Sequence, residues 1–224
     1  MKHLTTFLIA LLILGGCGKR PEAPKEVVIP GIIPEAVLQQ AQQKYGVFAR
    51  NRFEAYNAKL IALQERPVEA KLEAVNDFFN QVPHGEDIDV WGVEDYWATP
   101  LEFLGKDRGD CEDYVIAKYF TLVDLGIDPD KLYFSYVKSL RFNTEHMVLS
   151  YFETPDAVPL VLDNTNYKIF PADLRRDLQP VYNFNRRSFY RADPSGRNGE
   201  RVVSSRKNYL KWDRLLNDVK NHKL

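Results

Sequence analysis

The 224-residue chain has only two cysteines, no excess of either charge and no apolar run long enough to cross a membrane. Two cysteines cannot form the disulfide framework of a small secreted domain. Thirty Lys and Arg against 31 Asp and Glu leave a net charge of −1, which gives no bulk reason to expect nucleic-acid binding. The sequence also contains no internal repeat and no low-complexity tract. With 45% apolar and 27% charged residues, it is a globular chain and not a collagen, a disordered chain or a polytopic membrane protein.

The first 16 residues have the pattern of a secretion signal. Lys2 and His3 precede an apolar stretch at residues 4–14, which is too short for the ~20 residues of a spanning helix. The Leu-Gly-Gly-Cys ending at Cys17 resembles the lipobox of bacterial lipoproteins, in which the cysteine is lipidated and becomes the new N-terminus. The alternative is a plain secretory signal with an incidental Cys17. We expect a periplasmic protein whose lipid anchor lies in the outer membrane, since Gly18 does not suggest retention in the inner one.

Residues 17–34 are rich in proline and charge, and such a segment behaves as an extended spacer. We therefore expect a tether over residues 17–34 and a single folded domain over residues 35–224. If Cys17 is lipidated, Cys111 is the only free thiol of the mature chain, and no internal disulfide can form.

Hydrophobic periodicity predicts an α+β fold with N-terminal helices, a central helix that carries Cys111, and an antiparallel sheet. Residues 35–82 have helical spacing and predict two or three amphipathic helices, whereas residues 83–110 look like a long ordered loop. A helix apolar on nearly all sides is expected from Cys111 to about Leu125, before Gly126. Period-two patterns predict strands over residues 132–140, 146–152 and 158–162.

Two segments carry opposite charge. Residues 86–113 contain ten acids and two bases, and residues 186–224 contain eleven bases and four acids. The simplest interpretation is that they are solvated faces that partly neutralise each other. A nucleic-acid site is not expected in an exported chain.

Cys111 occupies a position suited to a nucleophile. A helix N-terminus presents unpaired N–H groups and the positive end of the helix dipole, which favour thiolate over thiol. A lone cysteine is more often a small buried apolar residue. The Asp-Cys-Glu-Asp context at Cys111 makes a poor apolar environment, which favours the nucleophile.

His146 and Asp163 lie on two strands that are expected to pair. If the connecting loop is centred between Thr154 and Pro155, facing residues have numbers that sum to 309, as those of His146 and Asp163 do. Directly opposed residues have Cβ atoms ~4.5–5.5 Å apart, so the carboxylate can bond one imidazole nitrogen and leave the other for a thiol. A slip of one residue would break this pairing, and His146 alone could equally be a packed strand histidine. The chain order Cys, His, Asp is that of papain-like chemistry.

Four blocks carry a resemblance to a known family, at residues 95–104, 108–114, 145–149 and 162–164. Over about residues 70–185 the chain resembles the bacterial transglutaminase-like cysteine proteinases, specifically the LapG-type periplasmic proteases. The resemblance implies a transglutaminase-like core with Cys111 as nucleophile, His146 as general base and later acid, and Asp163 as orienting carboxylate. It also implies cleavage near the N-terminus of a large surface adhesin, which controls biofilm attachment, and sequestration by an inner-membrane cyclic-di-GMP receptor.

Acidic residues surround the thiol and would raise its pKa, so a compensating cation is expected. Clusters of carboxylates suit Ca²⁺, and the resemblance implies calcium dependence with Asp110 and Glu112 as ligands. Asp113 is a third candidate. In the alternative, Asp110 caps the helix and Asp113 completes a reciprocal cap without any metal. The resemblance also makes Trp97 a candidate wall of the substrate groove, although a core aromatic is an equal alternative.

The sequence therefore predicts a calcium-dependent periplasmic cysteine endopeptidase. One alternative is a transglutaminase, because the same triad forms the same thioester and only the acceptor differs. Another is a non-catalytic periplasmic binding lipoprotein, which the presence of all three triad members disfavours. The backbone N–H of Cys111 is the first choice of oxyanion donor, and the second donor stays open.

Overall fold

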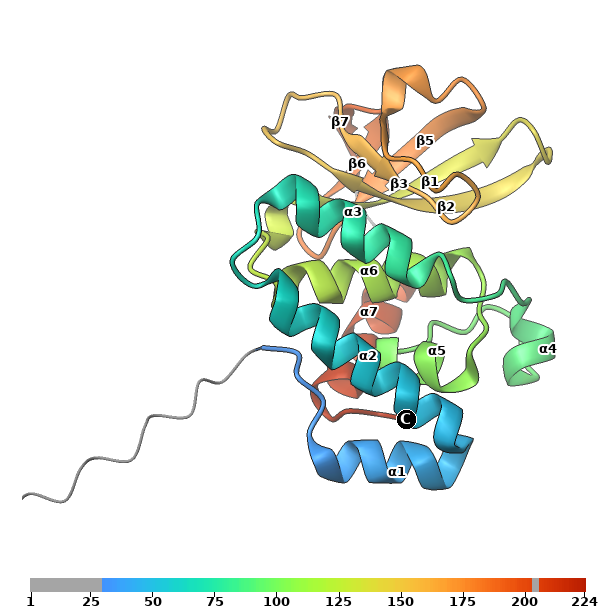
Figure 1. Ribbon diagram of the computed structural model, residues 1–224. Helices are drawn as coiled ribbons and strands as arrows, with labels where there is room; N and C mark the ends of the chain where they lie inside the picture. Colours follow the sequence, from blue (N-terminus) through green and yellow to red (C-terminus); the bar gives the residue numbers. More distant parts are fainter. Residues whose placement is uncertain (1–29, 203–205) are drawn as a thin grey trace, which may run out of the picture.

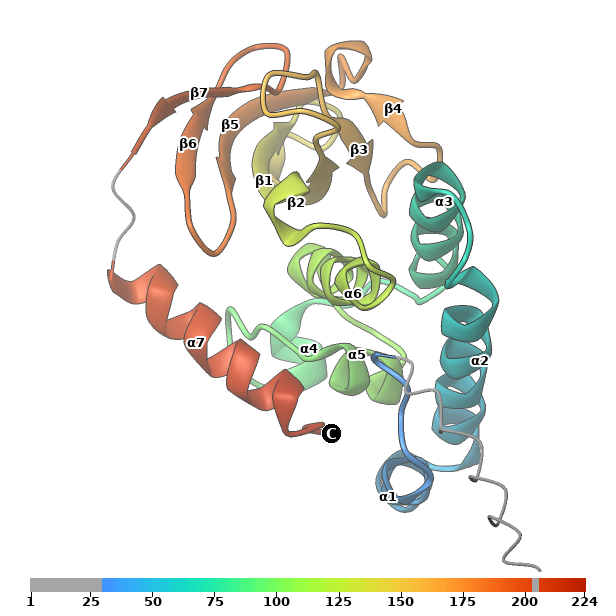
Figure 2. The same cartoon turned by 90° about the vertical axis from the view of Figure 1, so that its left-hand side faces the viewer.

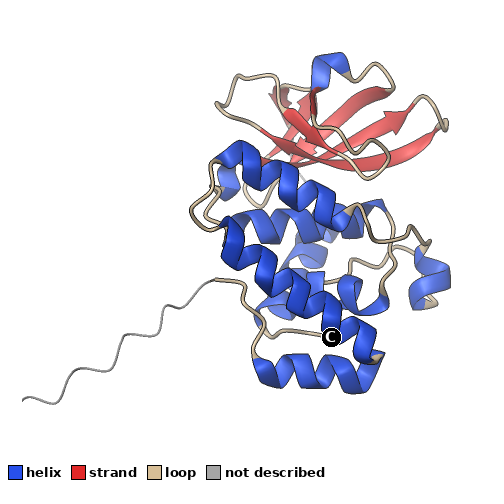
Figure 3. Ribbon diagram, viewed as in Figure 1, coloured by secondary structure: helices blue, strands red, loops and turns tan. Residues whose placement is uncertain are grey.

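The structure is a computed structural model that describes residues 30–202 and 206–224. The expected signal, the lipidation site at Cys17 and the tether up to residue 29 lie outside the described residues. The helices lie on one side of a single sheet (Figure 1 and Figure 3), which confirms the α+β class. The helices are α1 Glu35–Tyr45, α2 Val47–Leu63, α3 Val68–Phe79, α4 Asp87–Trp91, α5 Pro100–Lys106, α6 Cys111–Asp124 and α7 Arg206–Lys220, with short 3-10 turns η1 Pro129–Lys131 and η2 Ala172–Leu174. No helix among these residues is both long and apolar enough to span a membrane.

The sheet is antiparallel throughout, with strand order β4-β3-β2-β1-β5-β6-β7. Its strands are β1 Leu132–Ser139, β2 Thr144–Tyr151, β3 Leu160–Leu162, β4 Phe170–Pro171, β5 Leu178–Phe184, β6 Phe189–Ala192 and β7 Asn198–Arg201. The first three begin and end within two residues of the predicted strands. The strands after residue 163, and α7, were not predicted.

Helix α6 is the centre of the molecule. It lies between the sheet and the other helices (Figure 2) and packs against α3, α5 and β2. Nine of its 14 residues are buried, which agrees with the predicted apolar surface on all sides. The helix ends before Gly126, whose φ of +84° suits glycine because a Cβ there would be strained. Its first residue, Cys111, is therefore held on the buried central helix of the fold.

Residues 83–110 are not one long loop, as the sequence suggested, because α4 and α5 lie within them. Helix α5 begins with a capping box: the Thr99 side chain accepts from the Glu102 N–H, the Glu102 side chain accepts from the Thr99 N–H, and Pro100 occupies the first helical position. That combination is a recognised helix start. This helix was not predicted, because the aromatic and acidic composition of the segment obscures its hydrophobic periodicity.

The basic C-terminal helix α7 packs on the acidic segment. Lys211 forms an ion pair with Asp95, and Lys223, beyond the helix, lies 3.5 Å from Glu102. The Trp212 ring lies edge-on to Phe134 at 5.3 Å and anchors α7 to the core. These contacts agree with the expectation that the two segments partly neutralise each other.

Candidate active site

A pocket of about 560 Å³ forms where the start of α6, the β1–β2 hairpin and the segment after β3 meet. It brings together residues far apart in the sequence. Its lining residues are His84, Glu86, Asp110, Cys111, Glu112, Tyr136, Ser139, Phe142, Thr144, Glu145, His146, Met147, Asn164 and Thr165. The predicted nucleophile and the predicted base thus face one cavity.

Cys111 is the first residue of α6, and the Asp110 side chain caps the helix by accepting from the Glu112 N–H at 3.2 Å. The thiol is half-buried and donates to Glu112 Oε2 at 2.8 Å. Burial, the Glu112 carboxylate and the charge of Asp110 raise the pKa of Cys111 well above its ordinary value, against which the backbone N–H of Met147 acts weakly. The protein's own charges therefore oppose the thiolate.

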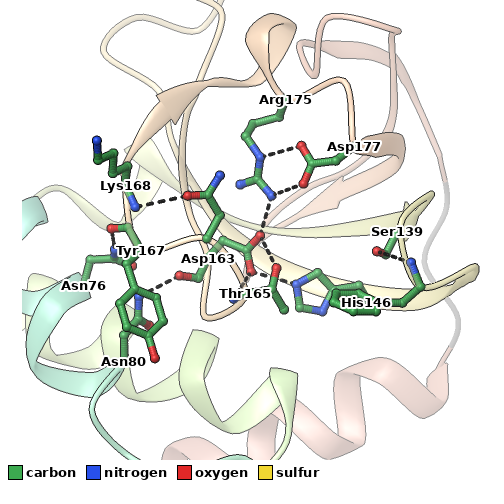
Figure 4. A network of polar contacts seen from close by, with 12 residues as sticks. Asn76, Asn80, Ser139, His146, Asp163, Thr165, Tyr167, Lys168, Arg175 and Asp177 are labelled. Carbon is green, nitrogen blue, oxygen red and sulfur yellow. Dashed lines mark hydrogen bonds and ion pairs between the residues drawn. The ribbon is translucent and has the colours of Figure 1, made fainter.

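His146 and Asp163 form the hydrogen bond that the sequence predicted. His146 Nε2 lies 2.8 Å from Asp163 Oδ1, and both side chains are buried (Figure 4). Because Nε2 is engaged by a carboxylate, it carries the ring proton and leaves Nδ1 as a proton acceptor. This is the arrangement that a base for a thiol requires.

The predicted register that led to this pairing is wrong. Leu149 pairs with Leu162, so facing residues sum to 311 and not to 309. Continued past the end of β3, this register places Thr165 opposite His146 and Asp163 at the diagonal position. A shift of two residues keeps side chains on the same face of a sheet, and diagonal neighbours remain within reach of long side chains.

The Asp163 carboxylate is held by several donors. Oδ1 also accepts from the Thr165 N–H at 2.9 Å, and Oδ2 accepts from the Thr165 hydroxyl at 2.9 Å and from Arg175 Nη2 at 2.7 Å. Burial alone would raise the pKa of Asp163, but the bonds from His146 and its other donors outweigh burial and hold the pKa well below its ordinary value. Asp163 is thus ionised across the physiological range.

A second feature of the site is a cluster of three carboxylates. Asp87, Asp110 and Asp113 each offer an oxygen, and these atoms lie within 4.8 Å of one another. Asp113 Oδ1 accepts from the Ala98 N–H at 2.8 Å, and Asp87 Oδ2 accepts from the Tyr96 N–H. The other oxygens, Asp87 Oδ1 and Asp113 Oδ2, are buried and have no partner among the described residues.

Burial and mutual repulsion disfavour the negative charge of this cluster. Burial, followed by the neighbouring carboxylates, raises the pKa of Asp110 to about 9. Burial is also the largest reason that the pKa of Asp113 rises to about 8, with Asp87 and Glu112 adding to it. Orphaned buried carboxylate oxygens in a group of three are the donor set that a hard divalent cation prefers.

Two of the three predicted metal ligands, Asp110 and Asp113, lie in this cluster. Glu112 does not, because its carboxylate accepts from the thiol of Cys111. Asp87, which α4 brings to the site from 23 residues before Asp110, was not predicted from the sequence. The capping alternative holds for Asp110, whose side chain accepts from the Glu112 N–H. Asp113 Oδ1 bonds the Ala98 N–H, and the backbone N–H of Asp110 also acts to lower the pKa of Asp113, as a reciprocal cap would.

Gly109 explains part of the motif around the nucleophile. A Cβ at this position would lie 2.4 Å from Asp113 Oδ2 and 2.7 Å from the Phe103 ring. No side chain fits there without displacing the Asp113 carboxylate, so the glycine preserves the geometry of the cluster.

Trp97 does not line the pocket. Its ring is buried and stacks on Phe134 with centroids 6.3 Å apart. The structure therefore supports the core alternative and not the groove wall. Its influence on the site is indirect, because the next residue, Ala98, supplies the N–H that bonds Asp113.

Comparisons with known proteins identify the family of the chain. The sequence profile of the bacterial transglutaminase-like cysteine proteinases matches residues 50–187, and the chain belongs to that family. It is a cysteine proteinase, as the sequence resemblance implied.

Among solved structures, the chain is similar to Legionella pneumophila LapG. The calcium-bound form is 40% identical, with a TM-score of 0.69 over 83% of this chain and 98% of that one. The EGTA-treated form is 40% identical, with a TM-score of 0.70 over 85% and 99%. A comparison with curated protein sequences finds no match.

Proposed function

We propose that this chain is a calcium-dependent cysteine endopeptidase in which Cys111, His146 and Asp163 act as a catalytic triad. The observation that carries the proposal is the bond between His146 and Asp163 beside a cavity that Cys111 shares. Three separate elements, α6, β2 and the segment after β3, supply these residues. If the His146–Asp163 bond served only to stabilise the fold, it would not require a thiol on the side that faces the pocket.

The geometry supports acyl transfer in two steps. Cys111 Sγ attacks the carbonyl carbon of the peptide bond while its proton passes to His146 Nδ1, and His146 then gives that proton to the departing amine. The resulting thioester is hydrolysed by a water whose proton His146 accepts and returns to the sulfur. Asp163 holds the ring and stabilises the imidazolium formed in each step.

The developing oxyanion needs preorganised donors. As the first residue of α6, Cys111 has a backbone N–H without a partner inside the helix. This N–H and the positive end of the helix dipole lie next to the attacking sulfur, so we assign it as one oxyanion donor.

We propose Asp87, Asp110 and Asp113 as the residues that would hold calcium. Support comes from their unpartnered oxygens and from the similarity to a protein whose structures are described as calcium-bound and EGTA-treated. Bound calcium would supply positive charge next to the start of α6, where the carboxylates otherwise oppose the thiolate. Glu112, the ligand expected from the sequence, would have to release the thiol in order to join the set.

Substrate, partners and location follow from the resemblance and are proposals. We propose that the substrate is the N-terminal region of a large surface adhesin, whose cleavage controls biofilm attachment. We further propose that an inner-membrane cyclic-di-GMP receptor sequesters the protease. The signal and the Leu-Gly-Gly-Cys ending support a periplasmic location, with a lipid on Cys17 as the outer-membrane anchor.

The test is incubation of the purified protein with candidate adhesin N-terminal fragments, with calcium or with excess EGTA. Cleavage with calcium, its loss in EGTA and its loss in Cys111→Ala are the expected results. Mass spectrometry distinguishes cleaved chains from isopeptide-linked products, which a transglutaminase would form. Full cleavage in excess EGTA would remove calcium from the account, and cleavage by Cys111→Ala would remove the triad.

A further inference from the structure

The orientation of Asp163 is not set by the sheet. Strand β3 ends at Leu162, and its ladder with β2 ends at the same residue. Asp163 therefore lies in irregular chain, where backbone pairing does not fix the plane of its carboxylate. Side-chain contacts must decide it instead.

The two oxygens of Asp163 have different partners. Oδ1 bonds His146 and the Thr165 N–H, whereas Oδ2 bonds the Thr165 hydroxyl and Arg175 Nη2. The two oxygens of an ionised carboxylate are equivalent, so these bonds fix the plane of the group and not the identity of the oxygen that faces His146. Arg175 bonds the oxygen that does not bond His146 (Figure 4). Arg175 is thus the charged contact that, together with Thr165, holds the plane in which the carboxylate meets the imidazole.

Arg175 is itself fixed by Asp177. The guanidinium Nε and Nη2 lie 2.9 Å and 2.7 Å from the two oxygens of Asp177, while Nη2 also lies 2.7 Å from Asp163. A planar guanidinium held at two points has one remaining orientation. The Asp177 carbonyl in turn accepts from the Leu140 N–H at 2.8 Å, at the end of β1. Arg175 and Asp177 are therefore connected to the β1–β2 hairpin and to the chain that enters β5.

Charge balance gives Arg175 a second effect. The Asp163 side chain is fully buried and that of Arg175 is 2% exposed. A buried carboxylate requires a counter-charge, and a guanidinium is permanently charged. Arg175, which also pairs with the half-exposed Asp177, supplies that charge, so ionised Asp163 has a counter-charge besides the imidazole.

We propose that Arg175, held by Asp177, is a positioning residue of this active site. It fixes the Asp163 carboxylate so that His146 keeps its proton on Nε2 and presents Nδ1 to the thiol. This inference rests on the proposed triad. It assigns no contact between Arg175 and substrate.

The test uses ¹⁵N-histidine NMR on the full chain in calcium-containing buffer, with the His146 signals assigned by their loss in His146→Gln. A second readout is the rate at which iodoacetamide alkylates Cys111, followed by mass spectrometry. Neither readout requires a substrate. The wild type is expected to show one dominant Nε2–H tautomer. Arg175→Met is expected to give a mixture of tautomers and an alkylation rate about tenfold lower, because the base is misoriented.

Other variants separate positioning from simple stability. Arg175→Lys keeps the positive charge but not the planar two-nitrogen contact of the guanidinium, so its alkylation rate is expected to lie between those of Arg175→Met and the wild type. Asp177→Ala removes the half-exposed carboxylate that holds the Arg175 guanidinium. It should therefore also give a mixture of tautomers and a lower alkylation rate, and it serves as the test of the Arg175 role if Arg175→Met does not fold. Arg187→Met, which removes an exposed ion pair between the β5–β6 turn and Asp130 in η1, is the matched control and should change neither readout.

Asp163→Ala makes the two levels of the proposal distinguishable. If Asp163→Ala changes both readouts and folded Arg175→Met changes neither, the positioning role of Arg175 is refuted while the triad stands. If Asp163→Ala also changes neither, the triad itself is refuted, and the role of Arg175 with it. Equal changes in Arg175→Met and Arg187→Met would show an unspecific effect and would also overturn the inference.

Discussion

Removal of the Asp163 carboxylate should destabilise the fold as well as stop catalysis. Asp163→Ala eliminates the acceptor of four hydrogen bonds, one from His146, two from Thr165 and one from Arg175. Arg175 keeps Asp177 as a partner, but its buried Nη2 loses the bond to Asp163. Breaking a buried ion pair by removal of one partner costs about 3–5 kcal/mol.

For a domain of this size, each kcal/mol lowers the melting temperature by about 2–4 °C, so Asp163→Ala should melt on the order of 10 °C below the wild type. Thermal unfolding followed by circular dichroism in calcium-containing buffer measures this directly. Asp130→Ala removes an exposed ion pair and should change stability by less than about 1 kcal/mol.

The double variant Asp163→Ala/Arg175→Met is the second part of this test. Because it removes both charges, it should lose less stability than the sum of the two single variants. A melting temperature of Asp163→Ala equal to that of Asp130→Ala would refute the reasoning, since it would mean that the buried network contributes nothing to the fold.

Three further predictions concern the metal cluster, a buried lysine and the leader. Gly109→Ala displaces the Asp113 carboxylate, so calorimetry should show calcium affinity lowered by about 10–100-fold, and unchanged affinity would exclude Asp113 as a ligand. Burial lowers the pKa of Lys118 to about 7 from 10.5. The unfolded chain therefore binds more protons between these values, and this group makes stability rise with pH from about 7 to 10. Urea unfolding at pH 7 and pH 9 should show a smaller rise in Lys118→Met, and an equal rise would contradict the assignment. A fatty-acid analogue should label the wild type and not Cys17→Ala, and no label in the wild type would end the lipid-anchor hypothesis.

The sequence was most informative where interacting residues belong to one hairpin. Facing positions on β2 and β3 are constrained by the loop between them, so the His146 and Asp163 pairing was predictable even though the register was wrong by two. The error of two residues had little effect, because Asp163 directly follows β3 and an even shift keeps a position on the same face of the sheet, after which side-chain contacts orient the carboxylate. The helix start at Cys111 was likewise encoded locally by the acidic cap and the glycine before it.

Contacts between distant segments were not predictable in this way. Asp87 reaches the carboxylate cluster only because α4 folds back onto the start of α6, and Arg175 reaches Asp163 only because the turn after η2 packs behind β2. Neither arrangement leaves a periodic pattern in the sequence. Trp97 is a further case in which a distant contact decides. From the sequence alone, a tryptophan near a catalytic motif fits a wall of the substrate groove as well as the core, and only its packing on Phe134 distinguishes the two.

The most direct test of the account is a crystal structure with bound calcium, in which the separation of Cys111 Sγ and His146 Nδ1 is measured. We predict hydrogen-bond reach between these atoms, with Nε2 bonded to Asp163 and the thiol no longer donating to Glu112. A sulfur that stays on Glu112 while the imidazole faces away from it would contradict the account.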